Sequence, residues 1–343
     1  MPLARLTIGE RLGRGSFGTV DAVQVDGASL ALKRISLVGT AAHERARVVA
    51  VARRDFRALR QLVHTNIVEL LGVVLDETDS IGLLLERALH GSLRSKLDIS
   101  PRAVVGEEHV QLRLAAGIAN GMAFLHAQTP PVLHHDLKSD NVLLFDGADG
   151  QLAPKLTDFG LAVNVGGSTA SLRTLSAGAG TVAYQAPEQF EEEPQFSEAN
   201  EVYSYAVVLL ELLHGGRPWA GRTPGYITHR VCNREQRPPE AGTLPDSFLK
   251  QLMVECWAQA PANRPMFASI DGRRGAPQPS TVSLEASCTD YSVAPPSTLT
   301  CNPRKSGSRR RPAPLQPAHS SDSMTSFVTK RSDRASCSRA SDS

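Results

Sequence analysis

A short segment at residues 132–144, VLHHDLKSDNVLL, holds three side chains whose types and spacing suit phosphate chemistry. Asp136 is followed two residues later by Lys138 and five residues later by Asn141. Transfer of a phosphoryl group to a hydroxyl needs a carboxylate that orients the hydroxyl and accepts its proton, a cation near the moving phosphate, and an oxygen ligand for Mg²⁺. The segment therefore offers one candidate for each of these three tasks.

A glycine-rich segment near the start of the chain could cover a polyphosphate. GRGSFGTV at residues 13–20 has the spacing G-x-G-x-x-G, which lets the backbone fold closely over phosphates and direct its N–H groups at them. The same spacing also marks dinucleotide-binding turns, but there the glycines open a helix. Here Thr19 and Val20 continue as a strand, so a dinucleotide oxidoreductase is rejected. Lys33, in the following strand, could present an ammonium group to the phosphates.

Two later segments complete the set. Asp158, within TDFG at residues 157–160, adds a carboxylate at a second metal position, and its Gly lets the chain turn. APE at residues 186–188 closes a stretch rich in Gly and Ser, which has the composition of an activation loop.

The elements that must position these residues fall into two groups along the chain. The first part reads as short β-rich segments with one helical interruption, and the second part reads as amphipathic or buried helices. The pattern therefore predicts an α+β fold with a small β-rich lobe and a larger helical lobe, joined near residues 86–92. The predicted strands are 6–13, 19–25, 30–35, 67–76 and 81–88, and the predicted helices are 43–63, 107–128, 201–216 and 247–259.

Composition divides the chain of 343 residues near position 271. Residues 275–343 carry nine Lys and Arg against five Asp and Glu, many Ser and Pro, and little aliphatic content, although the whole chain has a formal charge of only +2. Such a segment cannot bury enough apolar surface to offset the entropy of ordering it. We expect a folded domain at 6–270 and a disordered tail at 271–343.

The remaining composition indicates an intracellular location. The five Cys are not spaced as CxxC and are odd in number, which fits neither a disulfide framework nor a zinc site. The N-terminus lacks a signal-peptide core, and the apolar run at 206–213 is interrupted by Glu211 and too short to span a bilayer. We expect a soluble, cytoplasmic protein without a membrane span; the basic tail leaves a nuclear location open. Nothing in the bulk charge indicates a nucleic-acid partner.

Taken together and in this order, the motifs resemble those of the eukaryotic protein kinase family over roughly residues 6–270. The ordered set is glycine loop, Lys33, HHDLKSDN, DFG and APE, followed by SYAVVLLELL and CWAQAPANRP. Lys138 and GTVAY at 180–184 are similar to the Ser/Thr pattern, whereas GSL at 91–93 and the CW…RP segment have a tyrosine-kinase character. This mixture resembles the tyrosine-kinase-like group, whose members mostly phosphorylate Ser and Thr.

The resemblance implies a role for each motif residue, with ATP and Mg²⁺ as cofactors and protein Ser or Thr hydroxyls as substrates. Asp136 would act as base, Lys138 would steady the γ-phosphate, Asn141 and Asp158 would bind Mg²⁺, and Lys33, paired with Asp55, would hold the α- and β-phosphates. Leu85 would be the gatekeeper beside the nucleotide. The nucleotide would contact the glycine loop and its flanks (Leu12, Gly13, Arg14, Gly15, Ser16, Phe17, Gly18, Thr19 and Val20), the adenine-facing side chains Ala31 and Leu143, and the hinge residues Glu86 and Ala88.

Four positions depart from the family pattern: Asp55, His135, Glu201 and Ala206. Asp55 replaces a longer Glu as the partner of Lys33, and Glu44 is a rival partner whose register against HTNIV at 64–68 is poor. His135 replaces an Arg that holds a phosphorylated activation loop in many kinases. Glu201 stands where an Asp usually anchors the catalytic loop, and Ala206 stands in place of a Gly. Because Lys33, Asp136, Asn141 and Asp158 are all present, and Glu188 and Arg264 match the family's buried ion pair, an active kinase is favoured over a pseudokinase scaffold that only binds nucleotide.

Overall fold

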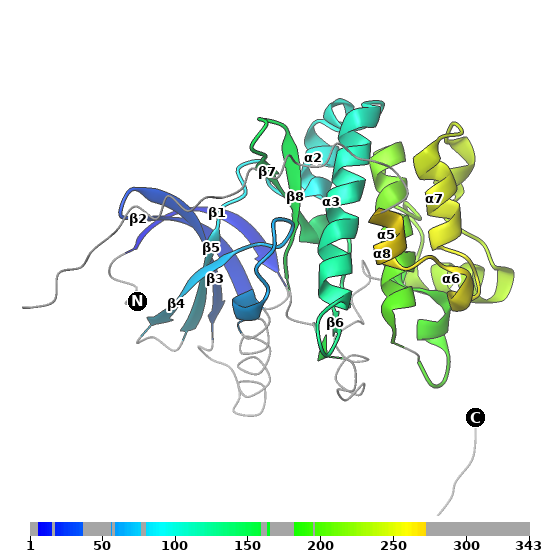
Figure 1. Ribbon diagram of the computed structural model, residues 1–343, viewed down its shortest axis with the longest axis horizontal. Coiled ribbons are helices and arrows are strands. Elements are labelled where there is room, and N and C mark those ends of the chain that lie inside the picture. Colours follow the sequence, from blue (N-terminus) through cyan, green and yellow to red (C-terminus); the bar gives the residue numbers. More distant parts are fainter. Residues whose placement is uncertain are drawn as a thin grey trace, which may run out of the picture. The chain divides into compact units, whose positions relative to one another are not determined.

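The computed structural model describes most of the chain between residues 6 and 271 (Figure 1). None of the described helices is long and apolar enough to cross a membrane. The predicted disordered tail lies outside the described residues from position 272 on. The described residues are 6–15, 18–36, 56, 59–76, 80–158, 163–164, 182–194 and 196–271.

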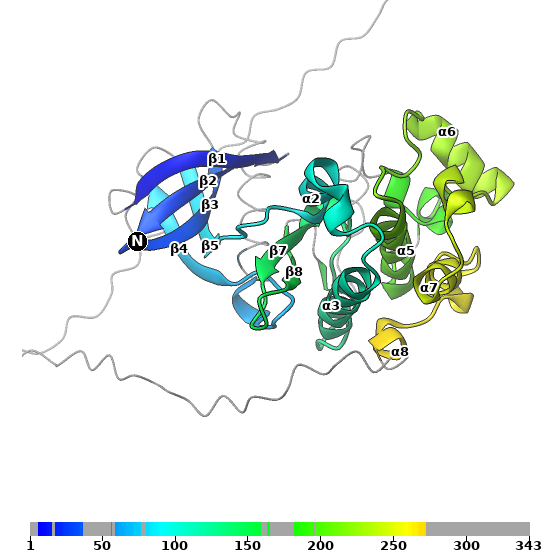
Figure 2. The ribbon, with the colours of Figure 1, turned by 90° about the horizontal axis from the view of Figure 1, so that it is seen from above.

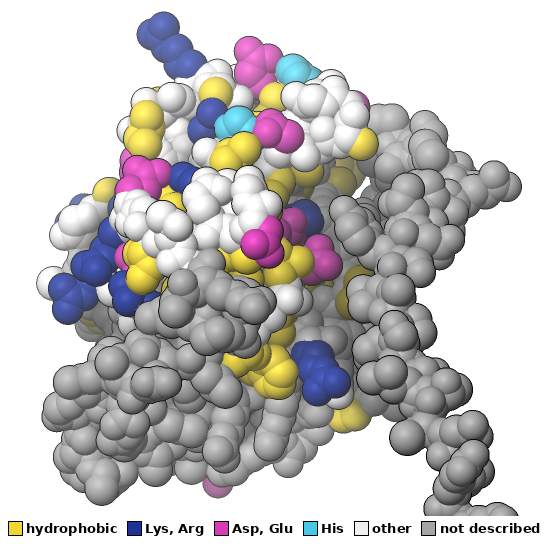
Figure 3. Space-filling model, turned by 90° about the vertical axis from the view of Figure 1, so that its left-hand side faces the viewer, with side chains coloured by type: hydrophobic (Ala, Val, Ile, Leu, Met, Phe, Trp, Pro, Cys, Tyr) yellow, Lys and Arg dark blue, Asp and Glu magenta, His cyan; other side chains and the backbone are white. Residues whose placement is uncertain are grey.

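The N-terminal part is a five-stranded antiparallel sheet in the order β1-β2-β3-β5-β4, as predicted from the β-rich segments. Asp26 and Gly27 form the two-residue turn between β2 and β3, and both have positive φ angles, which favours a tight hairpin. The side of the molecule seen in Figure 3 carries described side chains of both charges. The strands are β1 (Thr7–Gly15), β2 (Gly18–Val25), β3 (Ala28–Ser36), β4 (Leu70–Asp76) and β5 (Ser80–Glu86).

Strand β4 begins three residues later than predicted. Ile67 forms an isolated bridge with Leu156 instead of pairing with β5, and the Val68 amide donates to the Leu156 carbonyl at 2.9 Å. These apolar residues therefore connect the sheet to the second part of the molecule rather than extending it. Most of the predicted helix 43–63 lies outside the described residues, but Leu59 and Leu62 are buried in the main core.

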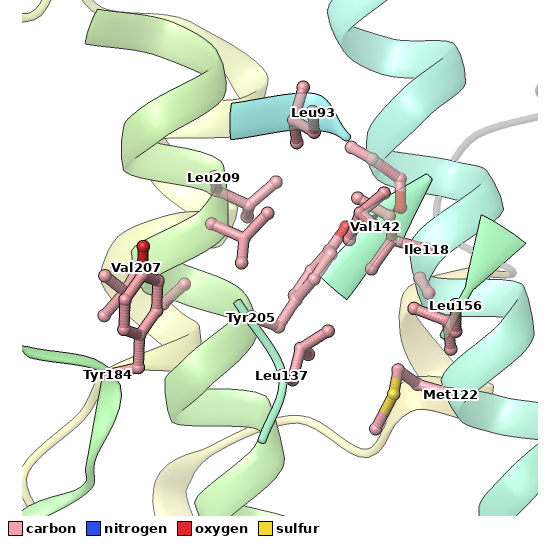
Figure 4. Close-up of a cluster of buried hydrophobic side chains, with 14 of the residues drawn as sticks. Leu93, Ile118, Met122, Leu137, Val142, Leu156, Tyr184, Tyr205, Val207 and Leu209 are labelled. Atoms are coloured by element: carbon pink, nitrogen blue, oxygen red, sulfur yellow. Dashed lines mark hydrogen bonds between the residues drawn. The ribbon is translucent and has the colours of Figure 1, made fainter. Parts of the chain in front are cut away.

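The C-terminal part is helical, and its longest helices agree with the prediction. Helix α5 starts earlier than predicted because Ser197 caps it, its amide donating to Asn200 Oδ1 at 2.6 Å. It ends at Gly215, which has a φ of 82°. Figure 4 shows Tyr205 of α5 directed toward α3, where its hydroxyl donates to the Ala115 carbonyl at 2.9 Å. The helices are α2 (Leu93–Ile99), α3 (Glu108–His126), α5 (Glu198–His214), α6 (Pro224–Thr228), α7 (Phe248–Cys256) and α8 (Phe267–Asp271).

A hairpin that the sequence reasoning did not predict lies between the sheet and α3 in both Figures 1 and 2. It consists of β7 (Val142–Asp146) and β8 (Leu152–Leu156), and β8 packs against α3. A second small sheet pairs β6 (Val132–Leu133) with β9 (Val163–Asn164). Helices α2 and α6 were also not predicted, because each spans less than two turns.

Candidate active site

The catalytic-loop residues Asp136, Lys138 and Asn141 lie together. The Lys138 ammonium is 2.7 Å from Asp136 Oδ2, and the Asn141 side-chain nitrogen donates to the same oxygen at 2.9 Å and to the Asp136 carbonyl at 2.8 Å. The loop runs from β6 to a 3₁₀ turn at Ser139–Asn141. Two donors on one oxygen fix the orientation of the Asp136 carboxylate.

The hairpin β7–β8 brings Asn141 next to Asp158. Val142 pairs with Leu156 at the open end of the hairpin, and the Thr157 amide donates to the Asn141 carbonyl at 3.0 Å. Asn141 directly precedes β7, and Asp158 follows shortly after the end of β8. Both residues therefore lie at the open end of the hairpin. Asp158 adopts a φ of 66°, an uncommon conformation outside Gly that redirects the chain at this point.

Lys33 reaches this end of the hairpin from the sheet. It pairs with Val20 in β2 and Leu83 in β5, which fixes its position in the middle strand, and its ammonium lies 3.1 Å from Asp158 Oδ1. The two residues are 125 positions apart in sequence, so the contact depends on the packing of the sheet against the helical part. The contact joins the residues that the resemblance assigns to the phosphates and to the metal.

The donor groups at this site suit a hard cation bound together with phosphates. Burial alone would raise the pKa of the Asp158 carboxyl, but the charge of Lys33 and its hydrogen bond outweigh burial and hold that pKa below the ordinary value. Asp158 is thus a carboxylate at neutral pH. Because Asn141 uses its amide nitrogen on Asp136, its carbonyl oxygen is the end it can offer to a metal. One carboxylate and one amide oxygen, completed by phosphate oxygens and water, match the preference of Mg²⁺.

The residues expected to enclose adenine lie close together in the core. Ala31 is buried and pairs with Leu85 across β3 and β5, and Val20 and Leu143 pack against the same cluster. The Glu86 amide donates to the Glu69 carbonyl at 3.2 Å, so within the hinge the carbonyl of Glu86 is the better candidate for adenine. These positions agree with the predicted pocket; the nucleotide contacts themselves stay a prediction.

The structure describes part of the predicted glycine loop. Of the glycine loop, Gly13, Arg14 and Gly18 lie in strands β1 and β2, and Leu12 is exposed, at 40%. Asp55, the partner predicted for Lys33, lies outside the described residues. The predicted site residues outside the described part are Ser16, Phe17 and Asp55; Phe159 and Gly160 of the TDFG segment and Thr181 of the GTVAY segment also lie outside it.

Glu201 holds the backbone of the catalytic loop in position, as predicted from its place in the sequence. Glu201 Oε1 accepts from the backbone amide of His135 at 2.6 Å, and Oε2 lies 2.7 Å from His126 Nε2. Burial opposes the charge of this carboxyl, but the His126 hydrogen bond and the nearby histidines lower the pKa of Glu201 below its ordinary value. His134, also buried, faces the Thr157 carbonyl at 3.0 Å through Nε2.

The predicted buried ion pair between Glu188 and Arg264 is confirmed. Arg264 contacts the carboxylate with both terminal nitrogens, at 2.6 and 2.9 Å, and Asn200 donates to the same carboxylate. This two-point contact ties the APE segment to the chain before α8. It holds the end of the segment that begins at Asp158.

A second buried charged cluster was not recognised from the sequence. Arg94 Nη1 lies 2.9 Å from Glu211 Oε1, the Tyr184 hydroxyl donates to Glu211 Oε2 at 2.9 Å, and Arg94 also binds Asp98 at 2.8 Å. The signal was present, because Glu211 interrupts an otherwise apolar helix and a buried charge needs a partner. The sequence alone could not show that the partner is Arg94 of α2.

Comparison with known proteins agrees with this geometry. The profile of the family described as protein tyrosine and serine/threonine kinase matches residues 6–273. The serine/threonine-protein kinase CTR1 of Arabidopsis thaliana is 33% identical over 79% of this chain and 31% of its own length. Mitogen-activated protein kinase kinase kinase 11 of Rattus norvegicus is 38% identical over 64% of this chain and 25% of its own, and receptor-interacting serine/threonine-protein kinase 3 of the same species is 36% identical over 64% and 47%. The chain thus spans less than half the length of each of these relatives.

Proposed function

The chain belongs to the protein tyrosine and serine/threonine kinase family, and from that premise we propose that it transfers the γ-phosphate of ATP to Ser and Thr hydroxyls of protein substrates. The observation that carries the proposal is the shared oxygen of Asp136, which receives both Lys138 and Asn141 within 2.9 Å. A carboxylate held in this way can orient an incoming hydroxyl without reorganising during the reaction.

The proposed step assigns each atom. The substrate hydroxyl oxygen forms a bond to the γ-phosphorus, the bond from that phosphorus to the oxygen bridging to ADP breaks, and the hydroxyl proton passes to Asp136. Lys138, 2.7 Å from Asp136, lies where its charge can stabilise the transferring phosphoryl group. Lys33 holds the α- and β-phosphates, and Asp55 positions Lys33.

Asn141 and Asp158 would hold Mg²⁺, which neutralises charge on the phosphates when bound. The remaining contacts with ATP come from the glycine loop and from the walls formed by Val20, Ala31 and Leu143. In the family, ATP and usually Mg²⁺ serve as cofactors; that this chain uses both is part of the proposal.

Selection of Ser and Thr rests on Lys138 in DLKSDN and on relatives whose names describe serine/threonine kinases. We place the enzyme in cytoplasmic signalling, where a nuclear fraction would fit the basic tail. The substrates and partners of the full-length protein belong to the same proposal, because the chain matches only part of each relative.

Incubation of the chain with Mg·ATP and a generic protein substrate tests this function. We expect phosphoserine and phosphothreonine to form, and Asp136→Asn to lower kcat by about 10²- to 10⁴-fold, because the base is lost. ATP binding, followed by thermal shift, should persist in that variant.

The same assay separates the enzyme from a scaffold. Turnover no higher than that of Asp136→Asn, with ATP binding intact, would support the pseudokinase alternative, which the complete set of ligands does not favour. Phosphotyrosine as the main product would overturn the assigned specificity and leave phosphoryl transfer standing.

A further inference from the structure

One stretch of the helical part is strongly basic. Residues 212–234 contain four Arg and two His but no Asp or Glu. The stretch covers the end of α5, helix α6 and the π-helical turn η7 (His229–Asn233). The folded part of the chain has slightly more acidic than basic residues overall, so this stretch is a local excess of positive charge that the catalytic machinery does not use.

A tyrosine in the middle of this stretch is held in place. Thr223 caps α6, its hydroxyl accepting from the Tyr226 amide at 3.3 Å, and Ile227 anchors the helix in the core. The ring of Tyr226 meets the buried Trp219 ring edge to face, with 6.3 Å between centroids. Tyr226 therefore has a fixed position at a partly exposed site.

Two arginines use this ring as a platform. The guanidinium carbons of Arg222 and Arg230 each lie 5.0 Å from the centroid of the Tyr226 ring. Within the described part of the chain neither arginine has a carboxylate partner. A guanidinium stacked on a ring keeps the N–H groups at its edge available for hydrogen bonds to anions. We call Arg222, Tyr226 and Arg230 the α6 surface.

We propose that the α6 surface binds an acidic segment of a protein partner. The two charges share one ring and so cannot lie farther apart than twice 5.0 Å. Alternate side chains of an extended peptide project to the same side about 6.6 Å apart, a spacing that two carboxylates can match to two guanidinium groups. The limit set by the shared ring includes this spacing.

Acidic side chains of the chain itself lie close to this stretch, but none of them pairs with its two stacked arginines. Glu240 Oε1 accepts from the Ala220 amide at 3.2 Å, Glu235 follows the basic stretch, and the charge of Glu191 acts on Cys232 in η7. Within the described residues, none of these three glutamates forms an ion pair with Arg222 or Arg230. The surface is therefore available to an acidic group from outside.

The α6 surface lies on elements that pack against the end of the activation segment. Helix α6 packs against residues 182–184, and η7 packs against residues 187–190, where Cys232 Sγ lies 3.8 Å from the Pro187 carbonyl. Residues 187–190 overlap the APE motif at 186–188, which closes the segment that begins at Asp158. A partner held on the α6 surface is thus kept beside the end of that segment. Its use in presenting a substrate rests on the proposed function, but the binding itself does not.

Fluorescence anisotropy with the full chain tests the binding. The probe is a labelled eight-residue peptide alternating Glu and Gly; the Lys–Gly peptide and a single-phosphoserine peptide are comparisons. We expect the Glu peptide to bind best and to weaken as salt rises from 50 to 300 mM, and the double variant Arg222→Glu/Arg230→Glu to lose at least about tenfold in affinity. Tyr226→Phe keeps the ring and should bind normally, whereas Tyr226→Ala should bind more weakly.

The control is the double variant Arg60→Glu/Arg102→Glu, which changes two other exposed arginines and the net charge by the same amount. Equal loss in this control would show that only total charge matters and would overturn the proposal, as would equal binding of the Lys peptide. Tight binding of the phosphoserine peptide alone would assign the surface to phosphate instead. Phosphorylation of a short generic peptide should be unchanged in Arg222→Glu/Arg230→Glu; absence of turnover in the unmodified chain would count against the proposed function and leave the binding result intact.

Discussion

Helix α5 carries a buried glutamate near each end, and the two respond to burial in opposite ways. Glu201 and Glu211 are 3% and 0% exposed, so both lose nearly all contact with water. The pKa of Glu201 is nevertheless lowered, whereas burial raises the pKa of Glu211. The difference must come from their partners.

At the first end, the partners favour the charged form. Burial disfavours the Glu201 carboxylate, but His126 and the His135 amide donate to its two oxygens. At the second end, Arg94 divides its donors among Glu211, Asp98 and the Gly215 carbonyl. The remaining neighbours of the Glu211 carboxyl are the neutral hydroxyls of Tyr184 and Ser139. Glu201, which supports the catalytic loop, is therefore favoured in its charged form. Glu211 serves mainly as a hydrogen-bond acceptor for Arg94 and Tyr184.

The largest expected effect is on stability at the second end. Glu211→Ala removes the acceptor of both Arg94 and Tyr184 and leaves a buried charge with one partner fewer, so we expect a loss of about 3–5 kcal/mol in the free energy of unfolding. Glu211→Gln keeps an oxygen for Arg94 and a group for the hydroxyl, and should cost less than about 1.5 kcal/mol. Urea unfolding measures both; a large cost for Gln would show that Glu211 must be charged.

The next effect is on turnover at the first end. Glu201→Ala removes the acceptor of the His135 amide, which holds a backbone with a φ of 65° next to Asp136. A charge-assisted hydrogen bond of about 1.5–3 kcal/mol corresponds to a loss of about tenfold to a hundredfold in kcat. The KM for ATP should change little, because Lys33 and the sheet are untouched.

Glu211→Gln is the matched control for that experiment, since it alters the same helix, keeps hydrogen-bonding groups beside Ser139, and leaves the contact between Glu201 and the His135 amide unchanged. Its kcat should stay near that of the unmodified chain when both are measured well below their melting temperatures. An equal fall in kcat for the two variants would mean that α5 transmits any change to the loop, and the contrast between its ends would fail.

The anchor of the loop was predictable from the sequence, but its geometry was not. The order and spacing of the motifs predicted that Glu201 contacts the catalytic loop and that Glu188 pairs with Arg264, because these motifs occur together in one fold. His126, the second hydrogen-bond partner of Glu201, and the charged cluster around Arg94 depend on where helices α2, α3 and α5 meet. Short elements such as α2 and the hairpin β7–β8 leave little periodicity in a sequence, and tertiary packing decides them.

Glu201 and Glu211 should also contribute with opposite signs to the pH dependence of the free energy of unfolding. A lowered folded pKa means that Glu201 contributes stability above its ordinary value of 4.5, and that this contribution is lost as the pH falls below 4.5 toward the folded pKa. A raised folded pKa means that the contribution of Glu211 is present below 4.5 and is lost as the pH rises through the folded pKa. The charge of Glu201 thus stabilises the fold, and that of Glu211 does not.

Replacement by Gln, which mimics the protonated form, makes these signs measurable. Glu201→Gln should cost most at neutral pH and progressively less toward pH 3.5, whereas Glu211→Gln should be least costly at neutral pH. Urea unfolding of both variants and the unmodified chain between pH 3.5 and 7 gives the two differences. Curves of the same slope would refute the opposite shifts.

The smallest expected effect concerns control of the anchored loop. His135 has its amide fixed by Glu201 and its ring edge against Phe196, with 5.6 Å between centroids. An imidazole is a weaker, pH-dependent ligand for phosphate than the guanidinium that many kinases carry here. We therefore expect phosphatase treatment to lower kcat by less than about threefold, although Ser168, Thr169, Ser171, Thr174 and Ser176, which lie outside the described residues, are candidate phosphorylation sites.

His135→Arg sharpens this prediction, because it restores a phosphate ligand without changing the backbone amide that Glu201 binds. The ratio of kcat before and after phosphatase treatment should rise in this variant relative to the unmodified chain. A large loss of activity on dephosphorylation of the unmodified chain, restored by an acidic substitution at one of the five sites, would show that another cation holds the phosphate. The Glu201 anchor alone would then be insufficient to keep the loop in its working geometry.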